Sequence, residues 1–139
     1  MKISLTKTLS AGIAATAVMT MVTFAAPMMG LPKMNPAEML SGMMGVPVAI
    51  GWLMHFMVGV VFAAAYAFLF LPNVKLPNLP IKGALFGIAV FVFAQIMMVM
   101  MSFVVGPMPM PEGGMMLTIV GSVIGHVVYG DVVALVARP

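Results

Sequence analysis

Two histidines, His55 and His126, lie inside long apolar stretches of the chain and have similar neighbours. His55 has a glycine four residues before it and another four residues after it, while His126 has Ser122 and Gly130 at the same spacing. An ionisable side chain in such a stretch is costly and usually functional. A neutral imidazole there can ligate a metal or form a hydrogen bond. The two histidines are therefore the first candidates for a site.

Thr20 and Gln95 are the polar residues expected at the same depth as the histidines. Each follows a Gly-Ile-Ala segment and lies eight residues after its glycine, Gly12 or Gly87. At about 1.5 Å per helical residue, these counts bring the four polar side chains to nearly one level. In the structural interpretation they hydrogen-bond one another and fix the register of the helices, at about 1 kcal/mol per bond. The sequence thus predicts a single polar layer.

A b-type haem is a second interpretation of the same residues. Axial ligation requires two neutral imidazoles from different helices at one depth, with small residues beside them to admit the macrocycle. His55 and His126 meet this requirement if their helices lie diagonally across a bundle. Haem propionates favour basic partners, and Lys33 is the only cation expected on the relevant side. The haem hypothesis stays open beside the structural one.

The chain contains 19 methionines, and all except Met1 gather toward one end of the predicted helices or in the loops at that end. Thioethers select Cu(I), so methionines above two imidazoles are able to form a copper relay. Methionine is also an adaptable apolar filler at packing and partner surfaces. Both interpretations remain open. The candidate copper ligands are Met97, Met98, Met100, Met101, Met108 and Met110.

The composition is that of a membrane protein. Of 139 residues, 63% are hydrophobic and 6% are charged, whereas about a quarter of a soluble domain is charged. Cysteine is absent, which excludes disulfides and thiolate sites. The net charge of +3 comes from scattered Lys and Arg residues, without the basic stripe that nucleic-acid binding requires. No catalytic set emerges, so we expect a non-enzymatic protein without a nucleic-acid partner.

Four apolar stretches are long enough to be helices that cross a bilayer, which takes about 20 residues. Unsatisfied backbone groups are not tolerated in lipid, so each stretch is predicted to be a helix, and the fold class is an all-α four-helix membrane bundle. The chain forms one transmembrane domain, residues 1–139. Its predicted spans are Thr8 to Met29, Val46 to Leu71, Gly83 to Val105 and Met115 to Ala137.

The positions of Lys and Arg predict the orientation, since positive charge is retained on the cytoplasmic side. Lys33 lies on one side of the predicted bundle, and the other five cations lie on the opposite side. Both termini are therefore expected in the cytoplasm. A cleaved signal peptide is the alternative for the first stretch, because Lys2 and Lys7 precede it and Thr23-Phe24-Ala25 resembles a weak cleavage site.

Shorter features lie beside the second stretch. Trp52 and Tyr66 mark its two ends, as interfacial aromatic residues do. In the preceding loop, Asn35 and Pro36 form a pattern typical of a helix N-cap and first helical residue. We expect a short amphipathic helix on the membrane surface with its methionines toward lipid.

The sequence indicates an internal duplication. The first and third stretches share the Lys-x4-Gly-Ile-Ala start, and the second and fourth share the surroundings of their histidines. The repeat halves are residues 7–71 and 82–137. Each half is a hairpin with an even number of spans, so both copies insert into the membrane in the same orientation. Small residues near the polar layer are expected to let helix backbones approach closely. They are Gly12, Gly51, Gly59, Gly87, Ser122 and Gly130.

Three segments carry a resemblance to a known family. "GWLMHFMVGVVFAAAY" at Gly51 to Tyr66, "GHVVYG" at Gly125 to Gly130 and "MMGLPKM" at Met28 to Met34 resemble a family of small bacterial four-span membrane proteins. That family has no assigned activity, so the resemblance implies the fold and an inner-membrane location but no substrate, cofactor or catalytic residue. We expect a structural or accessory component of a membrane assembly or homo-oligomer.

Overall fold

The computed structural model describes residues 3–107 and 113–138, which are mostly helical and contain no strand. Four helical segments are long and apolar enough to cross a membrane: Leu5–Met29, Val48–Asn73, Leu79–Val105 and Met115–Val136. The element order is α1 (Leu5–Ala25), η1 (Ala26–Met29), α2 (Pro36–Met44), α3 (Val48–Ala65), η2 (Tyr66–Phe70), α4 (Leu71–Asn73), α5 (Leu79–Val105) and α6 (Met115–Val136). The four predicted apolar helices are therefore present.

Local sequence explains where the helices begin. The Asn35 side chain accepts from the backbone N–H groups of Ala37 and Glu38, which confirms the predicted N-cap of α2. Asn78 caps α5 in the same way, accepting from the N–H of Ile81 at 3.1 Å. This helix starts at Leu79, four residues before the predicted span, because the cap sets its start while the prediction stopped at the charge of Lys82.

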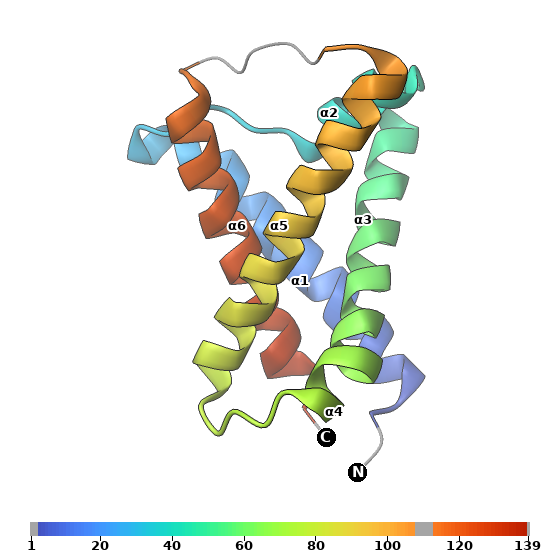
Figure 1. Cartoon of the computed structure of the whole chain (residues 1–139), viewed down its shortest axis with the longest axis vertical. Helices are drawn as coiled ribbons and strands as arrows, with labels where there is room; N and C mark the ends of the chain where they lie inside the picture. Colours follow the sequence, from blue (N-terminus) through green and yellow to red (C-terminus); the bar gives the residue numbers. More distant parts are fainter. Residues whose placement is uncertain (1–2, 108–112, 139) are drawn as a thin grey trace.

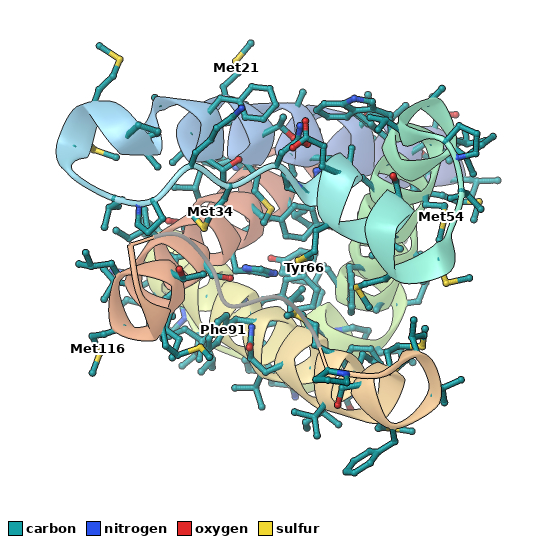
Figure 2. All side chains as sticks on the ribbon, turned by 90° about the horizontal axis from the view of Figure 1, so that it is seen from above. Met21, Met34, Met54, Tyr66, Phe91 and Met116 are labelled. Atoms are coloured by element: carbon teal, nitrogen blue, oxygen red, sulfur yellow. The ribbon has the colours of Figure 1, made fainter. Side chains whose placement is uncertain are left out.

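The helices form an up-and-down bundle in which α1 packs against α3 and α6, and α5 packs against α6. Seen from above, α3 and α6 lie on opposite sides of the bundle, as do α1 and α5 (Figure 2). Both termini lie at one end, called here the terminal end (Figure 1). There the Lys7 ammonium donates to the carbonyl oxygen of Arg138 at 3.1 Å. The short helix α2 lies at the opposite end, called here the far end.

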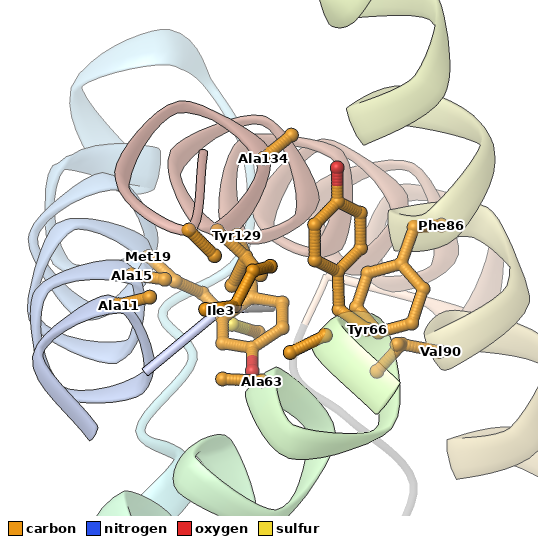
Figure 3. Close-up of a cluster of buried hydrophobic side chains, with 13 residues drawn as sticks. Ile3, Ala11, Ala15, Met19, Ala63, Tyr66, Phe86, Val90, Tyr129 and Ala134 are labelled. Atoms are coloured by element: carbon orange, nitrogen blue, oxygen red, sulfur yellow. The ribbon is translucent and has the colours of Figure 1, made fainter. Parts of the chain in front are cut away.

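The packed core lies in the terminal half of the bundle, and Figure 3 shows its side chains. Tyr66, Phe86 and Tyr129 contribute its aromatic rings, and small residues such as Ala63 and Ala134 let the helices close around them. The centroids of the Tyr66 and Phe86 rings are 5.0 Å apart, and this contact joins the end of the α3 segment to α5. The bundle is therefore closed by aromatic side chains near the termini.

A π-helical turn, η2, follows α3 and begins at Tyr66. Tyr66 is only 1% exposed and points into the core (Figure 3). The prediction that Tyr66 anchors the helix at the membrane interface is therefore wrong. The π turn adds a residue to the helical repeat and so rotates the side chains that follow it relative to an uninterrupted α-helix.

Candidate binding cavity

A cavity of about 1110 Å³ fills the far half of the bundle, above the aromatic core. Its wall comes from α1, α2, α3, α5 and α6, so the cavity is surrounded by every long helix. It exceeds the range of about 300–1,000 Å³ that is typical of small-molecule sites. Most wall residues are apolar, and the polar ones include His55, Gln95, Ser122 and His126. The bundle is thus packed at one end and hollow at the other.

His55 is held on α3 by a hydrogen bond to Thr20 of α1 across the helix interface. The Thr20 hydroxyl lies 2.7 Å from the carbonyl oxygen of Thr16, and it must donate there because a carbonyl oxygen only accepts. The Thr20 oxygen therefore accepts from the Nε2–H of His55 at 3.0 Å. This network assigns the proton of the neutral ring to Nε2 and leaves the lone pair on Nδ1.

His126 is held by its own helix, α6. Its Nδ1 lies 2.7 Å from the carbonyl oxygen of Ser122, one turn earlier, and so Nδ1–H donates to that oxygen. The lone pair of the neutral ring is then on Nε2. Backbone bonds of this kind commonly fix the tautomer of a functional histidine. The Phe91 ring of α5 packs edge to face against the His126 imidazole, with the ring centroids 5.7 Å apart, and supports it from the side.

The structure places three of the four predicted polar-layer residues in the cavity wall and the fourth next to one of them. His55, His126 and Gln95 line the cavity. Thr20 is buried behind His55 and reaches the layer through its hydrogen bond. Because α3 and α6 lie on opposite sides of the bundle (Figure 2), His55 and His126 belong to opposite walls of the cavity.

Methionine side chains make up much of the cavity wall. Eleven methionines among the residues that the structure describes line it, and Met34 points inward while Met21 and Met116 point away from the bundle (Figure 2). Met97, Met98 and Met101 are among the lining residues, whereas Met100 is 57% exposed and lies outside the lining set. The remaining proposed copper ligands, Met108 and Met110, lie outside the described residues.

The short helix α2 contributes to the cavity differently from our expectation. We predicted that its methionines face lipid, but Met39, Met43 and Met44 all line the cavity. The reason is its close packing on α3: a Cβ added at Gly51 would collide with the carbonyl group of Ala37. This contact draws α2 over the far end of the bundle. Lys33 and Glu38 also line the cavity, so it has a charged rim at that end.

Close packing by glycine occurs within each hairpin. A Cβ at Gly12 would lie 2.6 Å from the Cα of Val60, and one at Gly59 would collide with the Thr16 side chain. In the other hairpin, a Cβ at Gly87 would collide with the carbonyl oxygen of His126, and one at Gly130 with that of Gly83. Ser122 differs from these glycines, because it lines the cavity and its carbonyl oxygen holds His126.

The cavity has a lateral opening between α3 and α5. Met57 and Val61 of α3 and Phe93 of α5 line the cavity on this side and are also 59%, 62% and 51% exposed. Below this opening, the Phe62 and Phe93 rings meet edge to face with centroids 5.6 Å apart. The seam between these two helices is thus closed toward the terminal end and open above.

Two features of the site were not anticipated from the sequence. The hydroxyl of Tyr129 on α6 donates to the carbonyl oxygen of Gly59 on α3, which ties the two opposite helices together at the cavity floor. The only sequence signal was the glycine at position 59, whose missing side chain exposes its carbonyl. The cavity itself also left no signal, because its apolar wall residues are of the same types as a packed core.

Metal ligands of the usual kinds do not cluster in the part of the chain that the structure describes. Across residues 3–107 and 113–138, no three His, Asp or Glu side chains come together in a group able to hold a metal ion. Any metal there would therefore depend on the two imidazoles together with methionine sulfur, Gln95 or an external ligand.

Comparison with known proteins gives a family and no function. No curated protein and no solved structure matches the chain. The model of the family of unknown function DUF6789 matches residues 4–138. Nearly the whole sequence is covered, including all four long helices and both histidines. The chain therefore belongs to the family of unknown function DUF6789.

Proposed function

We propose that this protein is a non-enzymatic, multi-pass membrane protein that holds a hydrophobic ligand in the cavity of its far half. The observation that carries the proposal is the cavity of about 1110 Å³ whose wall includes eleven methionines and both histidines. Methionine is flexible and polarisable, and it is common where a surface adapts to apolar ligands. A few polar groups in a largely apolar wall are typical of sites that orient such ligands.

The composition supports a binding role over catalysis. The sequence contains three acidic residues and no cysteine, which leaves few groups for acid–base or nucleophilic chemistry. Of the charged residues that the structure describes, Lys33 and Glu38 line the cavity, and they do so at its rim rather than at its polar layer. An accessory role beside other membrane proteins fits this small chain, because α5 is the least buried of its four long helical segments. Only 6% of the apolar window of α5 is buried, against 28–39% for the other three spans.

We infer an orientation with both termini in the cytoplasm and a location in the bacterial inner membrane. Lys7, Lys75, Lys82 and Arg138 belong to the terminal end, and Lys33 belongs to the far end. Retention of positive charge in the cytoplasm supports this orientation. The cavity then occupies the outer half of the bilayer, and its charged rim lies at the outer surface.

We also infer that the fold arose by duplication of a hairpin. In each hairpin a glycine of the first helix and a glycine of the second mark the closest approach: Gly12 with Gly59, and Gly87 with Gly130. These pairs occupy matching positions in the repeat halves 7–71 and 82–137. The seam between α1 and α6 is packed, whereas the matching seam between α3 and α5 is open above its aromatic pair. The departure from symmetry at this seam creates the lateral opening.

A filling substitution tests the binding proposal. Ala94 lines the cavity on α5, and Ala89 on the same helix is exposed and outside the cavity wall. We expect Ala94→Trp to lower the amount of lipid-soluble material that co-purifies per protein at least several-fold, measured by mass spectrometry of organic extracts. Ala89→Trp adds the same ring outside and should leave that amount unchanged. Equal extracts from all three proteins would contradict a ligand in this cavity.

A metal held by the two imidazoles is the second candidate, either haem iron or Cu(I). It is favoured by one observation: His55 and His126 keep one lone pair each while lining the same cavity, which also reaches Lys33 as a partner for propionates. One feature opposes haem. The free nitrogen of His55 is Nδ1, which is adjacent to Cβ, so a macrocycle bound there meets the backbone unless the ring leaves Thr20.

An absorption spectrum and metal analysis separate these two metals from an organic ligand. Protein purified gently after expression with added haem should show a Soret band if haem binds, and retained copper in competition with a Cu(I) chelator if copper binds. Changing Met97, Met98 and Met101 together to Leu should then lower copper retention. Absence of both signals from the purified protein would remove the metal candidate and leave the organic ligand.

A further inference from the structure

The two histidines present the same chemistry to the cavity, although different bonds hold them. Each ring donates its N–H to the protein, His55 to Thr20 and His126 to the carbonyl oxygen of Ser122. Each neutral ring is therefore left with an unprotonated nitrogen, which only accepts hydrogen bonds. A polar ligand that satisfies both rings must then donate two hydrogen bonds.

The route into the cavity restricts the ligand further. The opening between α3 and α5 is bordered by side chains that are both exposed and cavity-lining, including Met57, Val61 and Phe93. All three are apolar, and the helices that carry them are long and apolar enough to cross a membrane. A molecule dissolved in the bilayer can therefore pass sideways into the cavity without leaving an apolar environment.

The shape of the ligand follows from the polar inner end and the apolar outer end of this path. The histidines approach from opposite walls, and the methionine-rich wall and the lateral opening surround them with apolar surface. A ligand that suits this site has a compact polar head that reaches the imidazoles and a flexible apolar tail that lies along the wall or in the opening. Methionine side chains adjust to such tails with little strain.

We propose that the ligand is a lipid-soluble hydroquinone or a similar diol with an apolar tail, bound through hydroxyl groups that donate to Nδ1 of His55 and Nε2 of His126. This inference rests on the proposed ligand-binding function and adds the class of the ligand. It concerns binding alone and involves no electron transfer. The oxidised quinone has the same ring and tail but carries only acceptor oxygens, which face the lone pairs of both imidazoles.

The expected discrimination is large because an unpaired buried acceptor is costly. Losing a donor opposite a buried acceptor costs about 1–3 kcal/mol, and about 1.4 kcal/mol changes a dissociation constant tenfold. We therefore expect the hydroquinone to bind at least about tenfold more tightly than its quinone. The dimethyl ether of the hydroquinone, which has no hydroxyl donor and is not converted to the quinone by air, should bind as weakly as the quinone.

The experiment compares these three probes on the intact wild-type chain in lipid nanodiscs. A hydroquinone with a short isoprenoid tail, its quinone and its dimethyl ether are titrated without oxygen, and bound probe is measured by mass spectrometry of the washed discs. Empty nanodiscs correct for partitioning into lipid. Tighter binding of the hydroquinone than of both other probes is the supporting result.

A pair of variants then assigns the discrimination to the histidine. His126→Leu removes the acceptor, and the preference for hydroquinone should fall several-fold. His126→Gln keeps an acceptor oxygen and should retain more of the preference. Both variants are compared at equal helicity and equal elution volume, and the wild-type titrations remain decisive if either fails to fold.

The failures of the two proposals are distinguishable. If none of the three probes binds above empty nanodiscs, and Ala94→Trp also leaves the co-purifying material unchanged, the ligand-binding function is overturned. If all three probes bind equally, the cavity still holds apolar ligands and the donor requirement is wrong. A Soret band or retained copper that is present in the wild-type protein and lost in His126→Leu would likewise overturn the hydroquinone inference in favour of a metal.

Discussion

The Oγ1 atom of Thr20 and the Nε2 atom of His55 lie 3.0 Å apart and join α1 to α3 at the level of the polar layer. Both side chains are buried, so the bond is shielded from water. It orients the imidazole and fixes which nitrogen carries the proton. A side chain that does not line the cavity thus sets the chemistry of one that does.

Replacement of Thr20 by valine tests this relationship. Thr20→Val keeps the shape of the side chain and removes the acceptor for His55, so we expect a loss of about 1 kcal/mol of unfolding free energy. Thr23→Val is the matched control, because Thr23 is equally buried and its hydroxyl bonds only the Thr20 backbone carbonyl. Reversible unfolding in mixed micelles measures both. A loss for Thr20→Val no larger than that for Thr23→Val would contradict the assigned bond.

Two buried tyrosines should respond differently to loss of the hydroxyl group. Tyr129→Phe leaves the Gly59 carbonyl oxygen without the donor from α6, and we expect it to lower the unfolding free energy by about 1–2 kcal/mol. The Tyr66 hydroxyl is buried without a partner, so Tyr66→Phe should be neutral or stabilising. Thermal unfolding monitored by circular dichroism gives both changes. Equal destabilisation by the two substitutions would indicate that a water molecule satisfies Tyr66.

A methyl group at the helix crossings should prevent close packing. Gly59→Ala places Cβ on the Thr16 side chain, and overpacking of this kind costs about 1–3 kcal/mol. Gly130→Ala should cost a similar amount at the matching crossing of α5 and α6. Gly42→Ala is the control: nothing lies within 4 Å of its added Cβ, and alanine favours the helix by up to about 1 kcal/mol. Melting temperatures should fall for the first two variants only.

The inferred orientation can be tested with single cysteines, because the natural chain has none. Met29→Cys lies at the far end, where the wild-type Met29 side chain is 60% exposed. Leu76→Cys lies in the connection between α4 and α5 at the terminal end. In intact cells a membrane-impermeant maleimide should label position 29 and spare position 76. After the cells are opened, both should react. Labelling of position 76 alone in intact cells would reverse the orientation.

Much of the fold could be predicted because a bilayer leaves few choices. Long apolar stretches in lipid must satisfy their own backbone groups, so the four helices followed from hydropathy alone. The start of α2 followed from Asn35 and Pro36, whose capping chemistry is local. The start of α5 and the extent of the α3 segment were less accurate, because a capping side chain at Asn78 sets the start of α5 and the second helical segment continues through the π turn to Asn73.

The candidate site was only partly predictable. The spacing around the two histidines gave their depth, since helical rise converts residue counts into height. It gave neither the tautomers nor the partner of each ring, because Thr20 and Ser122 hold the imidazoles through contacts that depend on how helices rotate about their axes. The methionines illustrate the same difficulty: Met101 and Met100 are adjacent in sequence, yet only Met101 lines the cavity.

By itself, the sequence determined that this protein is a bundle of four apolar helices with two histidines at matched positions, because composition and periodicity act locally along each helix. Only the tertiary structure decided that the far half is hollow. Side chains of one apolar type can either meet a neighbour or line a void, and the difference depends on which seams close. Here α1 and α6 pack together while α3 and α5 part above Phe62 and Phe93, and that asymmetry leaves a cavity between the histidines.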